Sequence, residues 1–304
     1  EAAFRITFRL LAAKILLDRQ HAEAQSWRDA PVSTVLDGIE AYYSLDQLSS
    51  NPASTVPFEA ASAAWTLLRE ALSFRNISSD RLAFIYENTL VTADTRKRFG
   101  THSTPRQVAE YVVGRLDLSQ FSLDELTIFE QFTGAGTFLV AALRHLRDLL
   151  PEDLSGEQRH AVLVPRIHGA EIDTFASEVA TLSLILADYP NANGWKIRAE
   201  DLFRPTVLAQ QAAEAKVVLC NPPWEDFDAA ERAEYPDMAA KSFSKPMAVL
   251  RTVLDARPEG LGFVLPQGFL RQQQYSDLRQ RVAELYGRVE LTSLPDRVFQ
   301  RAGF

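Results

Sequence analysis

The sequence has almost no cysteine: Cys220 is the single one in 304 residues. One cysteine excludes an internal disulfide and any metal site built from clustered cysteines. A reducing, cytoplasmic environment therefore fits, and Cys220 itself is expected to be a small buried hydrophobic residue. The sequence also lacks any apolar run close to the ~20 residues that a membrane span needs, so no membrane association is expected.

An excess of basic charge is missing as well. The net charge is −8 and the isoelectric point is about 5.3. This argues against a surface that binds nucleic acid all over, but it leaves room for a local basic patch or a separate DNA-binding part. The chain starts at Glu1 without Met and stops at Phe304 in a turn-like RAGF, so we expect it to be a fragment.

What is present is ordinary globular composition, with 46% hydrophobic and 24% charged residues. This length supports one large domain and a smaller one. The first part, residues 1–95, shows helical periodicity around a loop at 49–57 and reads as an all-α scaffold domain. Its expected helices are 4–25, 35–48, 59–72 and 79–88.

Residues 96–304 instead alternate short apolar runs with amphipathic helices, which predicts an α/β fold with a doubly wound, mostly parallel sheet. The expected strands are Leu126–Phe132, Ile167–Ile172, Trp195–Ala199, Lys216–Leu219, Leu261–Leu265 and Val289–Leu294. The expected helices are Arg106–Leu116, Phe138–Leu150, Ala176–Tyr189 and Tyr275–Tyr286.

The most distinctive stretch is Asn221-Pro222-Pro223-Trp224, directly after the fourth strand. Two prolines end a strand, because each lacks an N–H and fixes φ. Asn221 Oδ1 and the Pro222 carbonyl can accept hydrogen bonds from a planar NH2 group, and Trp224 can stack on the ring that carries it. The plainer alternative is a proline turn that ends a strand, with Trp224 in the core.

Other polar landmarks also follow predicted strands. The first strand enters a glycine turn, with Gly134 and Gly136, that opens a helix. Glu171 ends the second strand, where an acidic side chain typically binds ribose hydroxyls, and Asp201 ends the third. Because ligands bind at the carboxyl ends of such strands, these positions predict one cleft for a ribose-containing cofactor beside an NH2-binding turn.

A further candidate precedes the sheet, in Gly100-Thr-His-Ser-Thr-Pro105. Thr104 is suited to cap the following helix and Pro105 to its first turn. A plain helix cap is the simple interpretation, and a helix N-terminus that binds a carboxylate is the functional one.

With these motifs, residues 75–304 resemble the class I S-adenosylmethionine-dependent methyltransferases, and more narrowly the large N6-adenine DNA methyltransferases of restriction or phage-defence systems. The blocks that carry the resemblance are Phe74–Leu90 with 100–105, Asn221–Trp224, Phe263–Pro266 and Leu294–Asp296. Two positions depart from the family: Ser103 stands where an aromatic is usual, and Glu130-Gln-Phe-Thr133 replaces Asp/Glu-Pro-Ala-Cys. No target-recognition domain is visible, and in the family it follows the catalytic domain.

The resemblance implies S-adenosylmethionine as cofactor, no metal, and double-stranded DNA with a flipped adenine as partner, with other restriction or defence subunits as further partners. The residues implied at the cofactor are Thr104, Pro105, Glu130, Thr133, Gly134, Gly136, Glu171, Ile172, Asp201 and Phe203. Those implied at the target adenine are Asn221, Pro222, Pro223 and Trp224.

The implied function is adenine-N6 methylation of DNA at a specific site, within restriction–modification or phage defence. Two alternatives stay open: a methyltransferase acting on a protein glutamine or on RNA, and a weakly catalytic scaffold subunit of a defence complex. A nicotinamide dehydrogenase is disfavoured, because it leaves Asn221–Trp224 unexplained and Leu139 stands where a third glycine belongs.

Overall fold

The structure is a computed structural model that describes residues 2–43, 56–71, 73–77, 104–189, 191, 193–295 and 298. The expected helix at 79–88 and the proposed domain boundary at residue 95 lie outside these ranges. The described part of the N-terminal region is helical, as expected. Its elements are α1 (Ala2–Asp18), η1 (Glu23–Trp27), α2 (Val32–Tyr43) and α3 (Phe58–Ala71).

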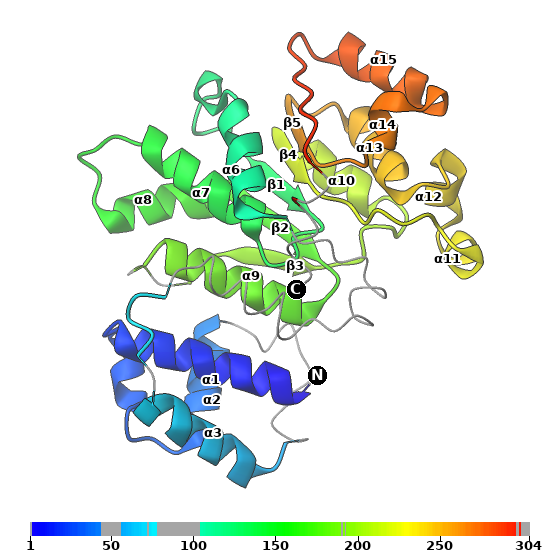
Figure 1. Ribbon diagram of the computed structural model, residues 1–304. Helices are drawn as coiled ribbons and strands as arrows, with labels where there is room; N and C mark the ends of the chain where they lie inside the picture. Colours follow the sequence, from blue (N-terminus) through cyan, green and yellow to red (C-terminus); the bar gives the residue numbers. More distant parts are fainter. Residues whose placement is uncertain are drawn as a thin grey trace.

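A five-stranded parallel sheet forms the centre of the molecule, in the order β3-β2-β1-β4-β5 (Figure 1). Its strands are β1 (Ile128–Gln131), β2 (Ile167–Glu171), β3 (Lys196–Ala199), β4 (Val217–Cys220) and β5 (Gly260–Phe263). The order reverses at β1, which pairs with β2 on one side and β4 on the other. The carboxyl ends of β1, β2 and β4 therefore flank the position where an open α/β sheet binds its ligands.

Helices cover both faces of the sheet. One face carries α6 (Arg106–Arg115), α7 (Thr137–Leu149) and α9 (Thr174–Ala187), whose buried side chains join those of α1–α3 in one core. The other face carries α10 (Val207–Glu214) and α13 (Lys245–Ala256), which share a second core. The strands alternate between the two cores, because successive side chains point to opposite faces: Ile128 belongs to the first and Phe129 to the second.

The remaining elements are short. They are η5 (Leu118–Gln120), α8 (Gly156–Leu163), η6 (Val164–Arg166), α11 (Ala229–Glu234), α12 (Pro236–Lys241), α14 (Gly268–Arg271), η7 (Gln273–Tyr275) and α15 (Ser276–Leu285). Within the described residues, no helix combines the length and apolar composition of a membrane span.

The helical layer of α1–α3 packs against α9 through buried charges (Figure 1). Arg9 contacts Glu178 at both carboxylate oxygens, at 3.2 and 3.0 Å, and Arg5 adds a contact at 3.4 Å. Arg5 also donates to Thr174 Oγ1, at the first residue of α9. Because α9 begins directly after β2, this cluster fixes the helical layer to the strand that ends in Glu171.

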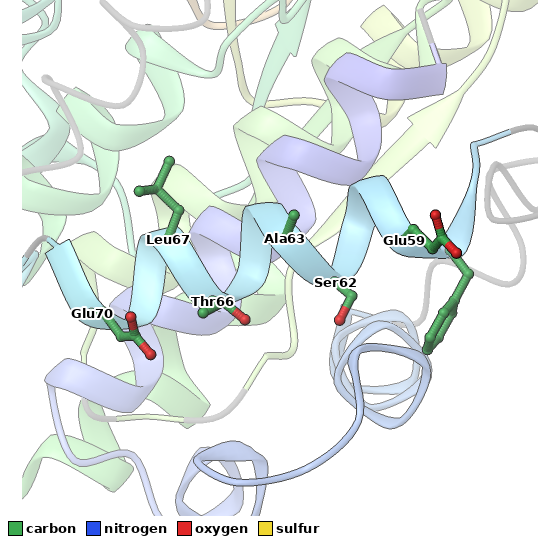
Figure 2. Close-up of a pocket in the computed structure, with 7 residues that line it drawn as sticks. Glu59, Ser62, Ala63, Thr66, Leu67 and Glu70 are labelled. Carbon is green, nitrogen blue, oxygen red and sulfur yellow. The ribbon is translucent and has the colours of Figure 1, made fainter.

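A surface pocket of about 550 Å³ lies along α3, lined by residues of that helix, including the exposed Phe58 and Leu67 (Figure 2). None of the described residues that line it belongs to the end of a strand. It therefore lies outside the candidate site.

The sixth predicted strand, Val289–Leu294, is wrong: these residues form no strand. Val289 and Leu291 are 43% and 59% exposed, so the alternating pattern buries no apolar face. Instead Glu290 binds α6, accepting from Tyr111 Oη at 2.9 Å and from Arg115 at 2.7 Å. Side-chain contacts to a helix have replaced strand pairing here.

Candidate functional site

The glycine turn after β1 is held in an unusual backbone conformation. Phe132, Gly134 and Gly136 all have positive φ, at 58°, 53° and 78°. For Phe132 this is a strained state of about 1–3 kcal/mol, and such states persist where the surroundings enforce them. Thr133 supplies part of that constraint, because its N–H binds Ala170 O and its hydroxyl binds Glu130 O, each at 3.0 Å.

The two glycines have different neighbours. A Cβ on Gly136 would lie 3.0 Å from the Ala180 Cβ, so this glycine allows α7 to approach α9 closely. A Cβ on Gly134 would meet no atom of the described residues within 4 Å. The space beside Gly134 is therefore open, as the close approach of a ligand to the backbone requires.

Glu171 lies against this turn. Its Oε2 accepts from the Gly134 N–H at 2.8 Å and its Oε1 from the Asp173 N–H at 2.9 Å. Burial raises the pKa of Glu171 to about 7, and the backbone donors oppose that shift. Ile172 next to it is 47% exposed, which leaves an apolar surface beside the carboxylate. A carboxylate at Glu171 and an exposed apolar side chain at Ile172 are groups suited to a ribose and to a flat ring, respectively.

Glu130 is buried against the start of α7, although the sequence resemblance assigns it to the cofactor. It is 2% exposed, and its Oε2 accepts from the Leu139 N–H at 3.1 Å, inside the first turns of α7. Burial raises the pKa of this carboxyl well above its usual range. Its visible contact holds the glycine turn to α7, and a contact with the cofactor stays a prediction.

Asp201 and Phe203 are brought together after β3. Asp201 Oδ1 accepts from the Phe203 N–H at 3.0 Å, and its Oδ2 accepts from Tyr235 Oη at the same distance. The Phe203 ring packs against Phe132, with centroids 5.3 Å apart, and against Phe227, at 5.2 Å. The aromatic cluster thus joins the turn after β1 to the loop after β3. Sequence reasoning missed Tyr235, which no motif marks.

Asn221 follows β4 directly and is 7% exposed. Its Nδ2 donates to Thr104 Oγ1 at 3.0 Å, and its Oδ1 accepts from Trp224 Nε1 at 3.2 Å. Pro222 and Pro223 are buried, so the turn between the amide and the indole is embedded in the protein. The structure therefore brings Asn221 and Trp224 together, as the motif predicts, and adds Thr104 to them.

The prediction that Thr104 caps α6 is wrong. The residue at the N-cap is Pro105, which makes no side-chain cap. The hydroxyl of Thr104 is directed to Asn221 instead. Because these two residues are 117 positions apart, no local pattern could reveal their contact.

Comparison with known proteins supports the resemblance to N6-adenine DNA methyltransferases. The family model described as N-6 DNA Methylase matches residues 77–303. The chain belongs to this family. Over 98 residues, it is 30% identical to the adenine-specific methyltransferase PglX of Streptomyces coelicolor, covering 30% of this chain and 8% of PglX.

Solved structures with the same fold include two restriction–modification proteins. One is the type IIL enzyme MmeI in complex with DNA, with a TM-score of 0.64 and 16% sequence identity. The match covers 93% of this chain and 50% of MmeI. The other is a modification subunit of a putative type I restriction enzyme from Vibrio vulnificus, with a TM-score of 0.57 and 18% sequence identity. The match covers 93% of this chain and 69% of the subunit. This N-6 DNA methylase chain thus spans half of MmeI and less than a tenth of PglX.

Proposed function

We propose that this chain is the catalytic part of an S-adenosylmethionine-dependent methyltransferase that acts on the N6 atom of adenine in double-stranded DNA. The observation that carries the proposal is the arrangement of polar groups at the carboxyl ends of adjacent strands. Glu171 and the Gly134 N–H meet at the ends of β2 and β1, and the Asn221 amide stands at the end of β4.

The residues around Gly134 fit the cofactor. The open space beside Gly134 admits the methionine portion, and the Glu171 carboxylate is suited to accept from ribose hydroxyls. The exposed Ile172 offers an apolar surface to the adenine ring, and Asp201 accepts from its amino group. S-adenosylmethionine would supply an electrophilic methyl group, its sulfur would keep the electron pair of the broken bond, and the methylated N6 would lose one proton to solvent.

The residues after β4 act on the target base. The adenine N6 lone pair is delocalised into the ring, so the amine is a poor nucleophile. The Asn221 Oδ1 and the Pro222 carbonyl accept from its two N–H groups and favour a pyramidal, more nucleophilic nitrogen. Fixed acceptors of this kind act by position and electrostatics, and no general base is assigned.

The adenine must leave the duplex to reach these groups, because base stacking hides its edge. Trp224 replaces part of the lost stacking, an interaction of about 1–3 kcal/mol per base. A role in restriction–modification, with further subunits, is proposed by analogy with MmeI and with the modification subunit from Vibrio vulnificus. A role in phage defence rests on the sequence resemblance alone.

The test is a methylation assay with methyl-labelled S-adenosylmethionine and DNA that lacks adenine methylation, read by mass spectrometry of the digested nucleosides. We expect N6-methyldeoxyadenosine from the wild type and none from Asn221→Ala, with cofactor binding retained by that variant. Gln280→Ala, an exposed amide on α15, is the matched control and should keep full activity. Label on protein or RNA alone would favour the alternative substrates.

A further inference from the structure

Among the described residues, the amide of Asn221 has two side-chain partners of different hydrogen-bonding character. Trp224 Nε1 lies 3.2 Å from Oδ1, and Thr104 Oγ1 lies 3.0 Å from Nδ2. Asn221 and Thr104 are 7% and 9% exposed, so water has little access to either group. The amide is therefore held by protein groups on both sides.

The indole determines which way the amide faces. An indole N–H only donates, so the amide atom next to it must be the oxygen. The Nδ2 group then faces Thr104, whose hydroxyl must accept from it. The last torsion of an asparagine is broad and roughly two-fold, so a side chain with no such partners adopts either orientation.

Thr104 itself stands on a rigid support. It precedes Pro105, and a residue before proline is restricted to extended backbone. The Pro105 carbonyl accepts from the N–H groups of Val108 and Ala109, at 2.9 and 3.1 Å, and so begins α6. The α6 helix packs on α7 and β5, which places the Thr104 hydroxyl relative to the sheet rather than on a free loop.

We propose that Thr104 is a positioning residue for the methyl transfer: it holds the Asn221 amide, with Oδ1 turned to the amino group of the target adenine. The inference rests on the proposed function, because the adenine is the group that Oδ1 serves. Trp224 selects the orientation and Thr104 keeps it. An amide oxygen has two lone pairs, so Oδ1 accepts from the target amine while it still accepts from the indole.

This role differs from the one that the resemblance implies for Thr104, which is a contact with the cofactor. The two roles separate in kinetics. Loss of a cofactor contact weakens cofactor binding, whereas loss of the support for Asn221 lowers the rate of transfer at saturating cofactor.

Thr104→Val is the informative variant, because valine keeps the shape of threonine and removes the acceptor. We expect its kcat to fall about 10–100-fold, the range that misplacement of a reacting group produces. The Kd for S-adenosylmethionine, measured by calorimetry, should stay within about twofold. Thr104→Ser keeps the hydroxyl and should restore most of the rate. A Thr104→Val enzyme with unchanged kcat, or one whose loss is entirely in cofactor Kd, would overturn the inference.

A second measurement needs no activity. The Nδ2 protons of Asn221, assigned by the loss of their signal in Asn221→Asp, should exchange slowly with solvent in the wild type and in Thr104→Ser, and faster in Thr104→Val. Equal protection in all three proteins would contradict the role of Thr104. If the wild type binds cofactor, shows this protection and methylates no adenine, the proposed function fails and the support of Asn221 by Thr104 stands.

Discussion

The Oε2 atom of Glu171 accepts a hydrogen bond from the N–H of Gly134, at 2.8 Å. This contact joins the ends of β1 and β2, two strands that are adjacent in the sheet. It places an acidic side chain directly beside Gly134, where an added Cβ would meet no described atom within 4 Å. The candidate cofactor site is built around this pair.

The raised pKa of Glu171 makes stability depend on pH. Burial moves this pKa from 4.5 to about 7, so between these values the folded protein keeps a proton that the unfolded chain has lost. The folded state then binds more protons, and stability falls as pH rises through this interval. We expect the free energy of unfolding in urea to fall less steeply between pH 5 and 7 in Glu171→Gln than in the wild type. Glu157→Gln, at an exposed position, should keep the wild-type slope.

Gln131 offers a gain in stability. It is fully buried at the end of β1, and neither its Oε1 nor its Nε2 has a hydrogen-bond partner among the described residues. A buried polar group without a partner costs about 1–3 kcal/mol, so Gln131→Met should raise the free energy of unfolding by about 1–2 kcal/mol.

Gln211 provides the comparison for this variant. It is also buried, and its Oε1 has no partner among the described residues, but its Nε2 donates to Glu200, a contact that methionine would remove. Gln211→Met should therefore lower stability, as measured by urea unfolding. A loss of stability in Gln131→Met would mean that its amide binds a group that the described residues do not provide.

The buried pair of Arg9 and Glu178 should be costly to break. Both side chains are 3% exposed or less, so Arg9→Met leaves a carboxylate in the core with Arg5, at 3.4 Å, as its remaining ion-pair partner among the described residues. Removing one member of a buried pair typically destabilises a protein by about 3–5 kcal/mol. In urea unfolding, Arg115→Met, whose partner Glu290 lies on the surface, should lose far less stability than Arg9→Met, because water screens an exposed ion pair. Similar losses in both variants would contradict the structural role given to Arg9.

The sheet was predictable from sequence because apolar residues and the turns after them mark its strands: β4 is a continuous apolar run, β1 precedes a glycine turn, and β3 has one buried residue, Ile197. The five strands lie within two residues of the predicted ranges, and the polar residues after β1, β2, β3 and β4 follow from them. The sixth strand failed because alternation at Val289–Leu294 is a local signal, whereas strand formation needs a neighbour and a face to bury.

The contacts of the site were less predictable than its positions. Thr104 with Asn221, and Tyr235 with Asp201, join segments 117 and 34 residues apart. A motif places a residue type at the end of a strand, but the partner of its side chain depends on how the helices pack. Arg5 and Arg9, which bind Glu178 from 173 and 169 residues away, escaped prediction for the same reason.

The most direct test of the account is a calorimetric titration of the chain with S-adenosylmethionine, compared with Gly134→Asp and Asn221→Ala. An aspartate at Gly134 places a side chain with a negative charge in the open space and forces a strained φ, so we expect binding in the wild type and none in this variant. Asn221→Ala should bind the cofactor as the wild type does, because we propose that the amide of Asn221 serves the target base and not the cofactor. No binding by the wild type, or binding that Gly134→Asp leaves unchanged, would contradict a cofactor site built on Gly134 and Glu171.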